Sequence, residues 1–161
     1  MAEEIERKFL VAGDGWQQAI TGHKRLVQGY LSSNAKATVR IRIADDQRAV
    51  LTLKGPAEGI SRAEFEYDVP LDDAWQMLGL AQPNVVEKTR YLVPHGGLTW
   101  EVDVFAGAHA GLIVAEVELD AVDQAIDMPD WAGREISHDD RYANASLARV
   151  PGVPSVDPDA A

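Results

Sequence analysis

Charged residues recur at a spacing of two along much of this chain. The acidic pairs with this spacing are Glu4/Glu6, Glu64/Glu66, Glu101/Asp103 and Glu116/Glu118, and the basic pairs are Arg40/Arg42 and Lys88/Arg90. A spacing of two is the repeat of a β-strand, so both members of a pair leave their strand on the same side. The residues between them are mostly apolar. The pattern therefore indicates strands that have one charged face and one apolar face.

The same alternation, interrupted by turn residues, predicts eight strands. They are expected over residues 3–11, 25–32, 37–44, 48–54, 61–69, 85–93, 98–105 and 112–120. Short helices are expected at about 15–21, 71–79, 121–127 and 139–149. Eight strands with few helices indicate an α+β chain that is mostly β, folded as an antiparallel barrel. The length suits one domain over residues 1–150, and the Pro-rich tail at 151–161 is expected to be disordered.

The charged strand faces predict an unusual barrel interior. Small barrels normally fill their interior with apolar side chains, but here the charged faces recur too consistently for a packed core. A membrane barrel also alternates polar and apolar residues, but these strands are short and interrupted by helices. We therefore expect an eight-stranded antiparallel β-barrel with a polar, charged lumen and peripheral helices over its apolar outer face. An apolar patch left uncovered there would favour a homodimer.

Composition disfavours several classes of function. The chain has no cysteine, which excludes disulfides and thiolate metal sites. Its net charge of −11 disfavours binding to duplex nucleic acid, which usually requires a basic surface. The N-terminus lacks the basic start and apolar run of a secretory signal, and no segment approaches the roughly 20 apolar residues of a membrane helix. We expect a cytoplasmic protein without a membrane partner.

Acidic and basic side chains gathered in one lumen suggest a particular chemistry. Carboxylate oxygens are ligands for hard divalent cations, chiefly Mg²⁺ or Mn²⁺. Arg and Lys bind phosphate oxygens, Arg through its bidentate fork and Lys as a point charge. Together these groups match a polyphosphate chain bridged by metal. The alternative is a solvated strand face with cross-strand ion pairs, and the pattern alone leaves both interpretations open.

A set of short motifs lies in order along the chain, beginning with the segment Glu4-Ile5-Glu6-Arg7-Lys8. This segment resembles the ExExK signature of the CYTH family, the triphosphate tunnel metalloenzymes. The other similar segments are Gln28-Gly29-Tyr30-Leu31, Val39-Arg40-Ile41-Arg42, Thr52-Leu53-Lys54, Arg62-Ala63-Glu64-Phe65-Glu66, Lys88-Thr89-Arg90-Tyr91, Trp100 to Phe105, and Ala115 to Leu119. Near the end, Gly133-Arg134-Glu135 and Asp140 to Asn144 are similar to the short bacterial branch.

The resemblance implies a tunnel, open at both ends, in which Mg²⁺ or Mn²⁺ supports hydrolysis or cyclisation of triphosphates. It implies that Glu4, Glu6, Glu116 and Glu118 are the principal metal ligands, with Glu64, Glu66 and Asp103 as further ligands or as groups that orient water and cations. It implies a phosphate-binding lining of Lys8, Arg40, Arg42, Lys54, Arg62, Lys88 and Arg90. Glu6, Lys8 and Lys54 are the expected catalytic residues, with Glu6 orienting a metal-bound water toward the terminal phosphorus.

Three functions are compatible with this resemblance. The first is an inorganic triphosphatase, a phosphoric anhydride hydrolase that acts on tripolyphosphate. The second is an adenylate cyclase, or a thiamine or nucleoside triphosphatase, of the same family. The third is an effector that binds a nucleotide messenger without turnover, which the full set of acidic residues disfavours. The C-terminal helix is expected either to stabilise the barrel or to plug one of its mouths.

Overall fold

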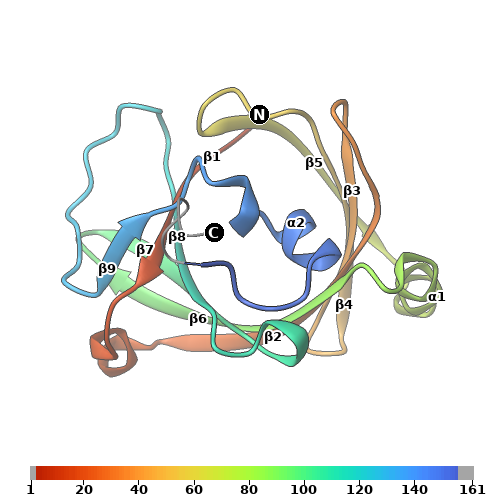
Figure 1. Ribbon diagram of the computed structural model, residues 1–161, viewed down its shortest axis with the longest axis horizontal. Helices are drawn as coiled ribbons and strands as arrows, with labels where there is room; N and C mark the ends of the chain where they lie inside the picture. Colours follow the sequence, from red (N-terminus) through yellow and green to blue (C-terminus); the bar gives the residue numbers. More distant parts are fainter. Residues whose placement is uncertain (1–2, 156–161) are drawn as a thin grey trace.

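Eight antiparallel strands close into a barrel in the computed structural model, which describes residues 3–155 (Figure 1). The strands are β1 (Glu3–Val11), β2 (Gly22–Ser33), β3 (Thr38–Ala44), β4 (Arg48–Lys54), β5 (Ser61–Val69), β6 (Val85–His95), β7 (Leu98–Phe105) and β8 (Ile113–Glu118). Their order around the barrel is β5-β4-β3-β2-β6-β7-β8-β1, and β1 pairs back onto β5. The eight-stranded antiparallel barrel predicted from the sequence is therefore confirmed.

The closure between β1 and β5 is short. Only Glu3–Ile5 of β1 pair with β5, opposite residues 61–63. Further along the same edge, β1 pairs instead with β9 (Ala132–Glu135), a ninth strand that the sequence did not predict. The sequence of β9 is short and lacks clear alternation, so its pairing with the β1 edge decides its conformation.

Strand register places opposite charges next to one another on the lumen side. Lys8 lies opposite Glu116 where β1 pairs with β8, and Lys54 lies opposite Glu64 where β4 pairs with β5. Directly opposite residues of an antiparallel pair are close enough for their side chains to interact. The charged strand faces thus converge and neutralise each other in part, which allows a lumen of this composition to form.

The outer face is apolar and is covered by short elements. The helix α1 (Leu71–Ala81) packs Ala74 and Leu78 against Ile41 and other residues of β2 to β4. A Cβ atom at Gly29 would lie 2.7 Å from the Cβ of Ala81, so only glycine allows this helix to approach β2 so closely.

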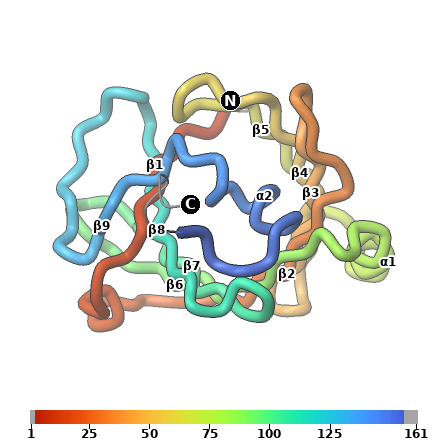
Figure 2. The backbone as a smooth tube through the Cα atoms, in the orientation of Figure 1, coloured from red at the N-terminus to blue at the C-terminus, as the bar shows by residue number. Residues whose placement is uncertain are grey.

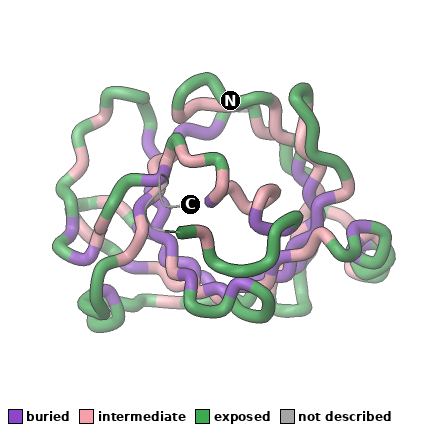
Figure 3. Tube along the Cα trace, in the orientation of Figure 1, coloured by how far each residue is buried: buried purple, intermediate pink, exposed green. Residues whose placement is uncertain are grey.

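The opposite side of the barrel has a second outer core. The 3₁₀ helix η1 (Gly15–Ala19) contributes Trp16 there, and Trp131, which precedes β9, packs edge-on against Trp100 of β7. Figure 3 shows that most buried residues lie on the strands, while the connecting loops are mostly exposed.

Part of the β4–β5 outer face stays uncovered. Leu53, Phe65 and Tyr67 are 38%, 46% and 59% exposed, and Trp75 on α1 is 43% exposed. The register places Leu53 directly opposite Phe65, so these two exposed residues are adjacent. An uncovered apolar face of this kind would favour a homodimer, which stays a prediction. None of the described helices is long and apolar enough to cross a membrane.

The C-terminal helix α2 (Asn144–Arg149) lies within the ring of strands (Figures 1 and 2). Its Leu147 and Ala148 belong to an apolar cluster with Tyr30, Val86 and Phe105, which occupy one end of the lumen. The helix fills that end, so the expectation of a tunnel open at both ends is wrong. The physical reason is that the lumen-facing residues change from charged to apolar at this end.

Several predicted boundaries also differ from the structure. Residues 121–127 are not helical; the side-chain oxygen of Gln124 accepts from the backbone N–H of Asp120, and Ile126 packs against the outer core. The helix expected to end at Gly79 continues to Ala81. The stretch 139–149 divides into η3 (Asp140–Tyr142) and α2, and η2 (Gly107–His109) lies between β7 and β8.

The first residues of the tail predicted to be disordered, 151–155, belong to the described part of the chain. The backbone N–H of Gly152 donates to the carbonyl of Ala108 at 2.9 Å, which ties the chain after α2 to η2. His109 is buried beside the same segment, with its Nε2 next to the carbonyls of Leu147 and Val150. Residues 156–161 of the predicted tail lie outside the described part of the chain.

Candidate active site

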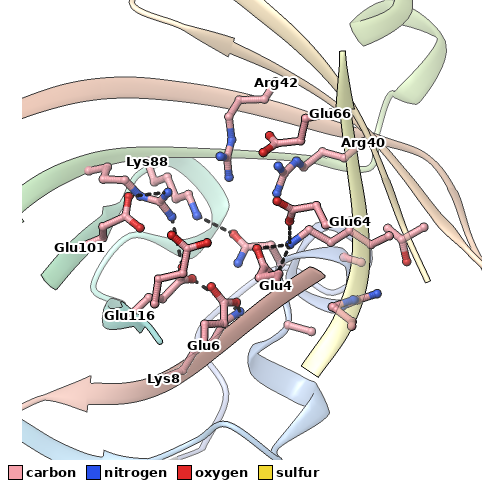
Figure 4. Close-up of a pocket in the computed structure, with 18 of the residues that line it drawn as sticks. Glu4, Glu6, Lys8, Arg40, Arg42, Glu64, Glu66, Lys88, Glu101 and Glu116 are labelled. Carbon is pink, nitrogen blue, oxygen red and sulfur yellow. Dashed lines mark hydrogen bonds and ion pairs between the residues drawn. The ribbon is translucent and has the colours of Figure 1, made fainter. Parts of the chain in front are cut away.

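The lumen contains a charged cavity of about 290 Å³ (Figure 4). The predicted site residues that line it are Glu4, Glu6, Lys8, Arg40, Arg42, Lys54, Arg62, Glu64, Glu66, Lys88, Arg90, Glu116 and Glu118. They occupy alternate positions of their strands, which is why the spacing of two could identify them. Asp103, the remaining predicted site residue, is fully buried and lies outside the cavity lining.

Two lysines of the lining are held by carboxylates. The amino group of Lys54 lies 3.1 Å from Glu4 Oε1 and 3.2 Å from Glu64 Oε2. The amino group of Lys8 lies 3.5 Å from Glu116 Oε1 and 3.8 Å from Glu6 Oε1. Burial opposes the protonation of Lys8, but Glu116 and Glu6 outweigh it and raise its pKa. The positive charge of Lys8 is therefore partly neutralised before any ligand enters the lumen.

Asp103 joins two further cations of the lining. Its Oδ1 and Oδ2 accept from Arg90 Nε and Nη2 at 2.8 and 2.9 Å, and Oδ2 also lies 2.7 Å from Lys88 Nζ. Burial opposes the ionisation of Asp103, but Arg90 and Lys88 outweigh it and lower its pKa. Since both oxygens are occupied by cations, this geometry favours the orienting role of Asp103 over the role of metal ligand.

The carboxylates on β1 and β8 differ in how well their charge is neutralised. Burial opposes the ionisation of Glu116, but Lys8 and Arg90 outweigh it and lower its pKa, whereas the pKa of each of the other three is raised. Burial, followed by the charge of Glu116, raises the pKa of Glu6 to about 8. Burial and a hydrogen bond with Glu64 raise the pKa of Glu4, and burial with the charge of Glu4 raises that of Glu118. A raised carboxyl pKa means that ionisation is unfavourable in this environment. An additional cation near these groups would relieve that cost.

Two arginines on β3 lack carboxylate partners within the described chain, unlike the two lysines held by carboxylates. Arg40 is 6% exposed, its Nη2 donates to the hydroxyl of Thr52 at 3.1 Å, and its Nε has no partner among the described residues. Arg42 donates from Nε to Gln28 Oε1 at 2.9 Å. Burial, together with the charges of Arg40 and Arg90, lowers the pKa of Arg42 to about 10. Neither guanidinium forms an ion pair within residues 3–155, so this wall attracts anions.

The donor set of Glu4, Glu6, Glu116 and Glu118 suits a hard divalent cation, because it consists of carboxylate oxygens. Within residues 3–155, however, no three acidic or histidine side chains are already grouped at metal-binding distance. The ion pairs described above explain this spacing, since the amino groups of Lys8 and Lys54 lie beside the same carboxylates. These four residues fit a metal site in chemistry, and their assignment as ligands stays a prediction.

Several residues of the site have contacts that the sequence did not predict. Arg62 lines the cavity but donates from Nε and Nη2 to the carbonyl of Gly55, at 3.0 and 2.7 Å. Glu101 pairs with Arg90 at 3.0 Å. Asn144 of α2 lines the cavity and accepts from Lys88 Nζ at 3.0 Å. A helix residue inside a barrel leaves no periodic signal, so spacing could not have identified Asn144.

Comparisons with known proteins find a matching family model and two similar proteins. The family model for the CYTH domain matches residues 2–149. An inorganic triphosphatase from Acetivibrio thermocellus is 41% identical over 152 residues, which cover 94% of this chain and 96% of that protein. An inorganic triphosphatase from Nitrosomonas europaea is 38% identical over 152 residues, which cover 90% and 96% of the two chains.

A solved structure supports the same fold. The crystal structure of the inorganic triphosphatase NE1496 superposes with a TM-score of 0.67 and is 34% identical, covering 94% of this chain and 99% of that one. A protein from Pyrococcus furiosus shares the fold at 17% identity, with a TM-score of 0.58 over 73% of this chain and 79% of that chain.

Proposed function

Because the chain belongs to the CYTH family, we propose that it hydrolyses triphosphate compounds, with inorganic tripolyphosphate as its preferred substrate. One observation carries this proposal: Arg40 and Arg42, which have no carboxylate partner within residues 3–155, form one wall of a cavity whose other wall carries carboxylates that a cation would stabilise. The guanidinium groups of Arg40 and Arg42 lie across the cavity from the carboxylates of Glu4 and Glu6 (Figure 4). A triphosphate that carries a divalent cation presents complementary charge to both walls.

The shape of the cavity favours a compact anion. Helix α2 fills one end of the lumen, and Ala143, Asn144 and Ala145 bound the cavity on that side. Tyr30 is the one aromatic residue that we find in the lining of the described chain, and its hydroxyl accepts from Gln28 Nε2 at 2.9 Å. The lining therefore offers charged groups for phosphate oxygens and little surface for stacking a base. This supports tripolyphosphate over a nucleotide.

The reaction requires positioning and charge neutralisation more than covalent chemistry. Water attacks the terminal phosphorus, the bridging P–O bond breaks, and pyrophosphate leaves. Arg40 and Arg42 would bind phosphate oxygens, and Lys8 and Lys54 would stabilise the charge that develops on them. Glu6 would orient the attacking water. A divalent cation, Mg²⁺ or Mn²⁺, held by the β1 and β8 carboxylates would neutralise phosphate oxygens and make the water more acidic.

Phosphate release tests the proposal. Purified protein is supplied with tripolyphosphate, ATP or thiamine triphosphate, in the presence of Mg²⁺, Mn²⁺ or EDTA. We expect metal-dependent release that is fastest on tripolyphosphate. Release that is faster on thiamine triphosphate or ATP would shift the assignment to the other triphosphatases. Cyclic product from ATP would indicate a cyclase, and saturable nucleotide binding without any product would indicate an effector.

Two variants serve as internal controls for this assay. Glu4→Gln removes a carboxylate from the lumen, and we expect it to abolish metal-dependent turnover while the circular dichroism spectrum is unchanged. Glu3→Gln makes the same chemical change at an exposed position of the same strand and should leave turnover intact. Full activity of the Glu4→Gln protein would refute the proposed site.

A further inference from the structure

The two guanidinium groups on β3 are held by neutral side chains. Gln28 Oε1 accepts from Arg42 Nε at 2.9 Å, and the Thr52 hydroxyl accepts from Arg40 Nη2 at 3.1 Å. Gln28 and Thr52 are both fully buried, so water does not compete for these hydrogen bonds. The arrangement differs from that of Lys8, Lys54, Lys88 and Arg90, which all contact carboxylates.

The orientation of the Gln28 amide follows from its other partners. Its Nε2 donates to the hydroxyl of Tyr30 at 2.9 Å and to Asn144 Oδ1 at 3.2 Å. Arginine has no acceptor, so the atom of Gln28 that faces Arg42 must be the oxygen. Asn144 Oδ1 in turn accepts from Lys88 Nζ, which fixes its own orientation. The network around Gln28 therefore has one consistent set of donors and acceptors.

A neutral acceptor has a different effect on Arg42 from that of a carboxylate. Both fix the Nε–H group and so limit the rotation of the side chain. A carboxylate also cancels the positive charge, as Asp103 and Glu116 do in part for Arg90. Gln28 engages only Nε, which leaves the two terminal nitrogens of Arg42 available for a bidentate contact with phosphate oxygens.

We propose that Gln28 is a positioning residue of the triphosphate site, which holds Arg42 in place while leaving its positive charge unneutralised. Thr52 likewise accepts a hydrogen bond from Arg40 without neutralising its positive charge. The inference rests on the proposed function, because it assumes that the anion bound by Arg42 is the triphosphate. Gln28 is buried and uncharged, so a pattern of charged residues does not indicate its role in substrate affinity.

Replacement of Gln28 by Glu provides the sharpest test, since it preserves shape and can still accept from Arg42 while adding a negative charge. Gln28→Met removes the hydrogen bond without adding charge. Gln17→Glu adds the same charge at an exposed position of η1, outside the barrel, and is the matched control. Each protein is titrated with tripolyphosphate in EDTA by calorimetry, and its KM and kcat are measured with Mg²⁺. Thermal melts establish that each variant is folded.

We expect Gln28→Glu to weaken tripolyphosphate binding in EDTA by at least about tenfold, because Arg42 is then neutralised. KM should rise by a similar factor, with a smaller change in kcat. Gln28→Met should weaken binding by about threefold through loss of positioning alone. Gln17→Glu should behave like the wild type, which excludes a general effect of net charge.

The outcomes separate this inference from the proposed function. A wild-type protein that neither binds nor hydrolyses tripolyphosphate refutes the proposed function. A wild-type protein that does both, with Gln28→Glu binding equally well, overturns the role of Gln28. Equal weakening in Gln28→Glu and Gln28→Met would show that the absence of charge on Gln28 has no effect on binding, and it would also overturn the inference. Should Gln28→Glu not fold, unchanged affinity in Gln28→Met overturns the inference on its own.

Discussion

Replacing Glu6 by Gln should stabilise the metal-free protein while abolishing its turnover. The side chain of Glu6 is 19% exposed, and its pKa is about 8 instead of the usual 4.5, because of burial and the charge of Glu116. At pH 7 the unfolded chain has an ionised Glu6, whereas the folded protein keeps it mostly protonated. From this difference, Glu6 lowers the free energy of unfolding by about 3 kcal/mol at pH 7.

The sign of the pH dependence follows from the same values. The folded protein binds the Glu6 proton more tightly than the unfolded chain, so unfolding releases a proton between pH 4.5 and about 8. The stability contributed by this group therefore falls as pH rises through that window. Glu6→Gln should gain about 3 kcal/mol at pH 7 but only about 1 kcal/mol at pH 5. At pH 7 this corresponds to a rise in melting temperature of roughly 6–12 °C.

Denaturant unfolding in EDTA at pH 5 and pH 7 measures both differences, with Glu3→Gln as the exposed control on the same strand. Added Mg²⁺ should stabilise the wild type more than Glu6→Gln, because the cation compensates for the charge that the variant lacks. The reasoning is refuted if Glu6→Gln is no more stable than the wild type at pH 7, or if its gain is the same at both pH values.

Three further predictions concern the metal, the inner helix and the outer face. Since Glu6 must lose its proton to bind a cation, Mg²⁺ affinity measured by calorimetry should increase with pH up to about 8, and a pH-independent affinity would contradict this. Leu147 is 1% exposed, so Leu147→Ala should lower the free energy of unfolding by about 2–5 kcal/mol, whereas Leu80→Ala, at an 80% exposed position, should change it little. If the uncovered β4–β5 face forms a homodimer, Phe65→Asp should convert the dimer to a monomer in sedimentation experiments; a monomeric wild type would show the homodimer prediction to be wrong.

The periodic part of the structure could be predicted from the sequence. Strand alternation has a period of two, so a local pattern is sufficient to assign β1, β4, β5 and β7 and to say which side chains share a face. The motifs resembling the CYTH family then indicated a closed barrel, and residues such as Glu6 and Arg40 do line its lumen. Strand positions and faces depend on neighbours a few residues away, which is why the sequence reveals them.

Other features depend on contacts between distant segments. Helix α2 enters the lumen because residues from β1, β2, β6, β7 and β8 form an apolar end there, which no single strand displays. β9 exists because β5 leaves part of the β1 edge unpaired.

The pairing of the charged residues with one another also depends on contacts between distant segments. Spacing placed Asp103 and Glu116 on the same strand faces as other acidic residues, and Arg42 and Arg90 among the basic ones. Only strand register decides that Asp103 pairs with Arg90 while Arg42 meets the neutral Gln28. A sequence pattern determines which side of a strand a charge occupies. Its partner, and therefore its pKa, is determined by which strands pair and in what register.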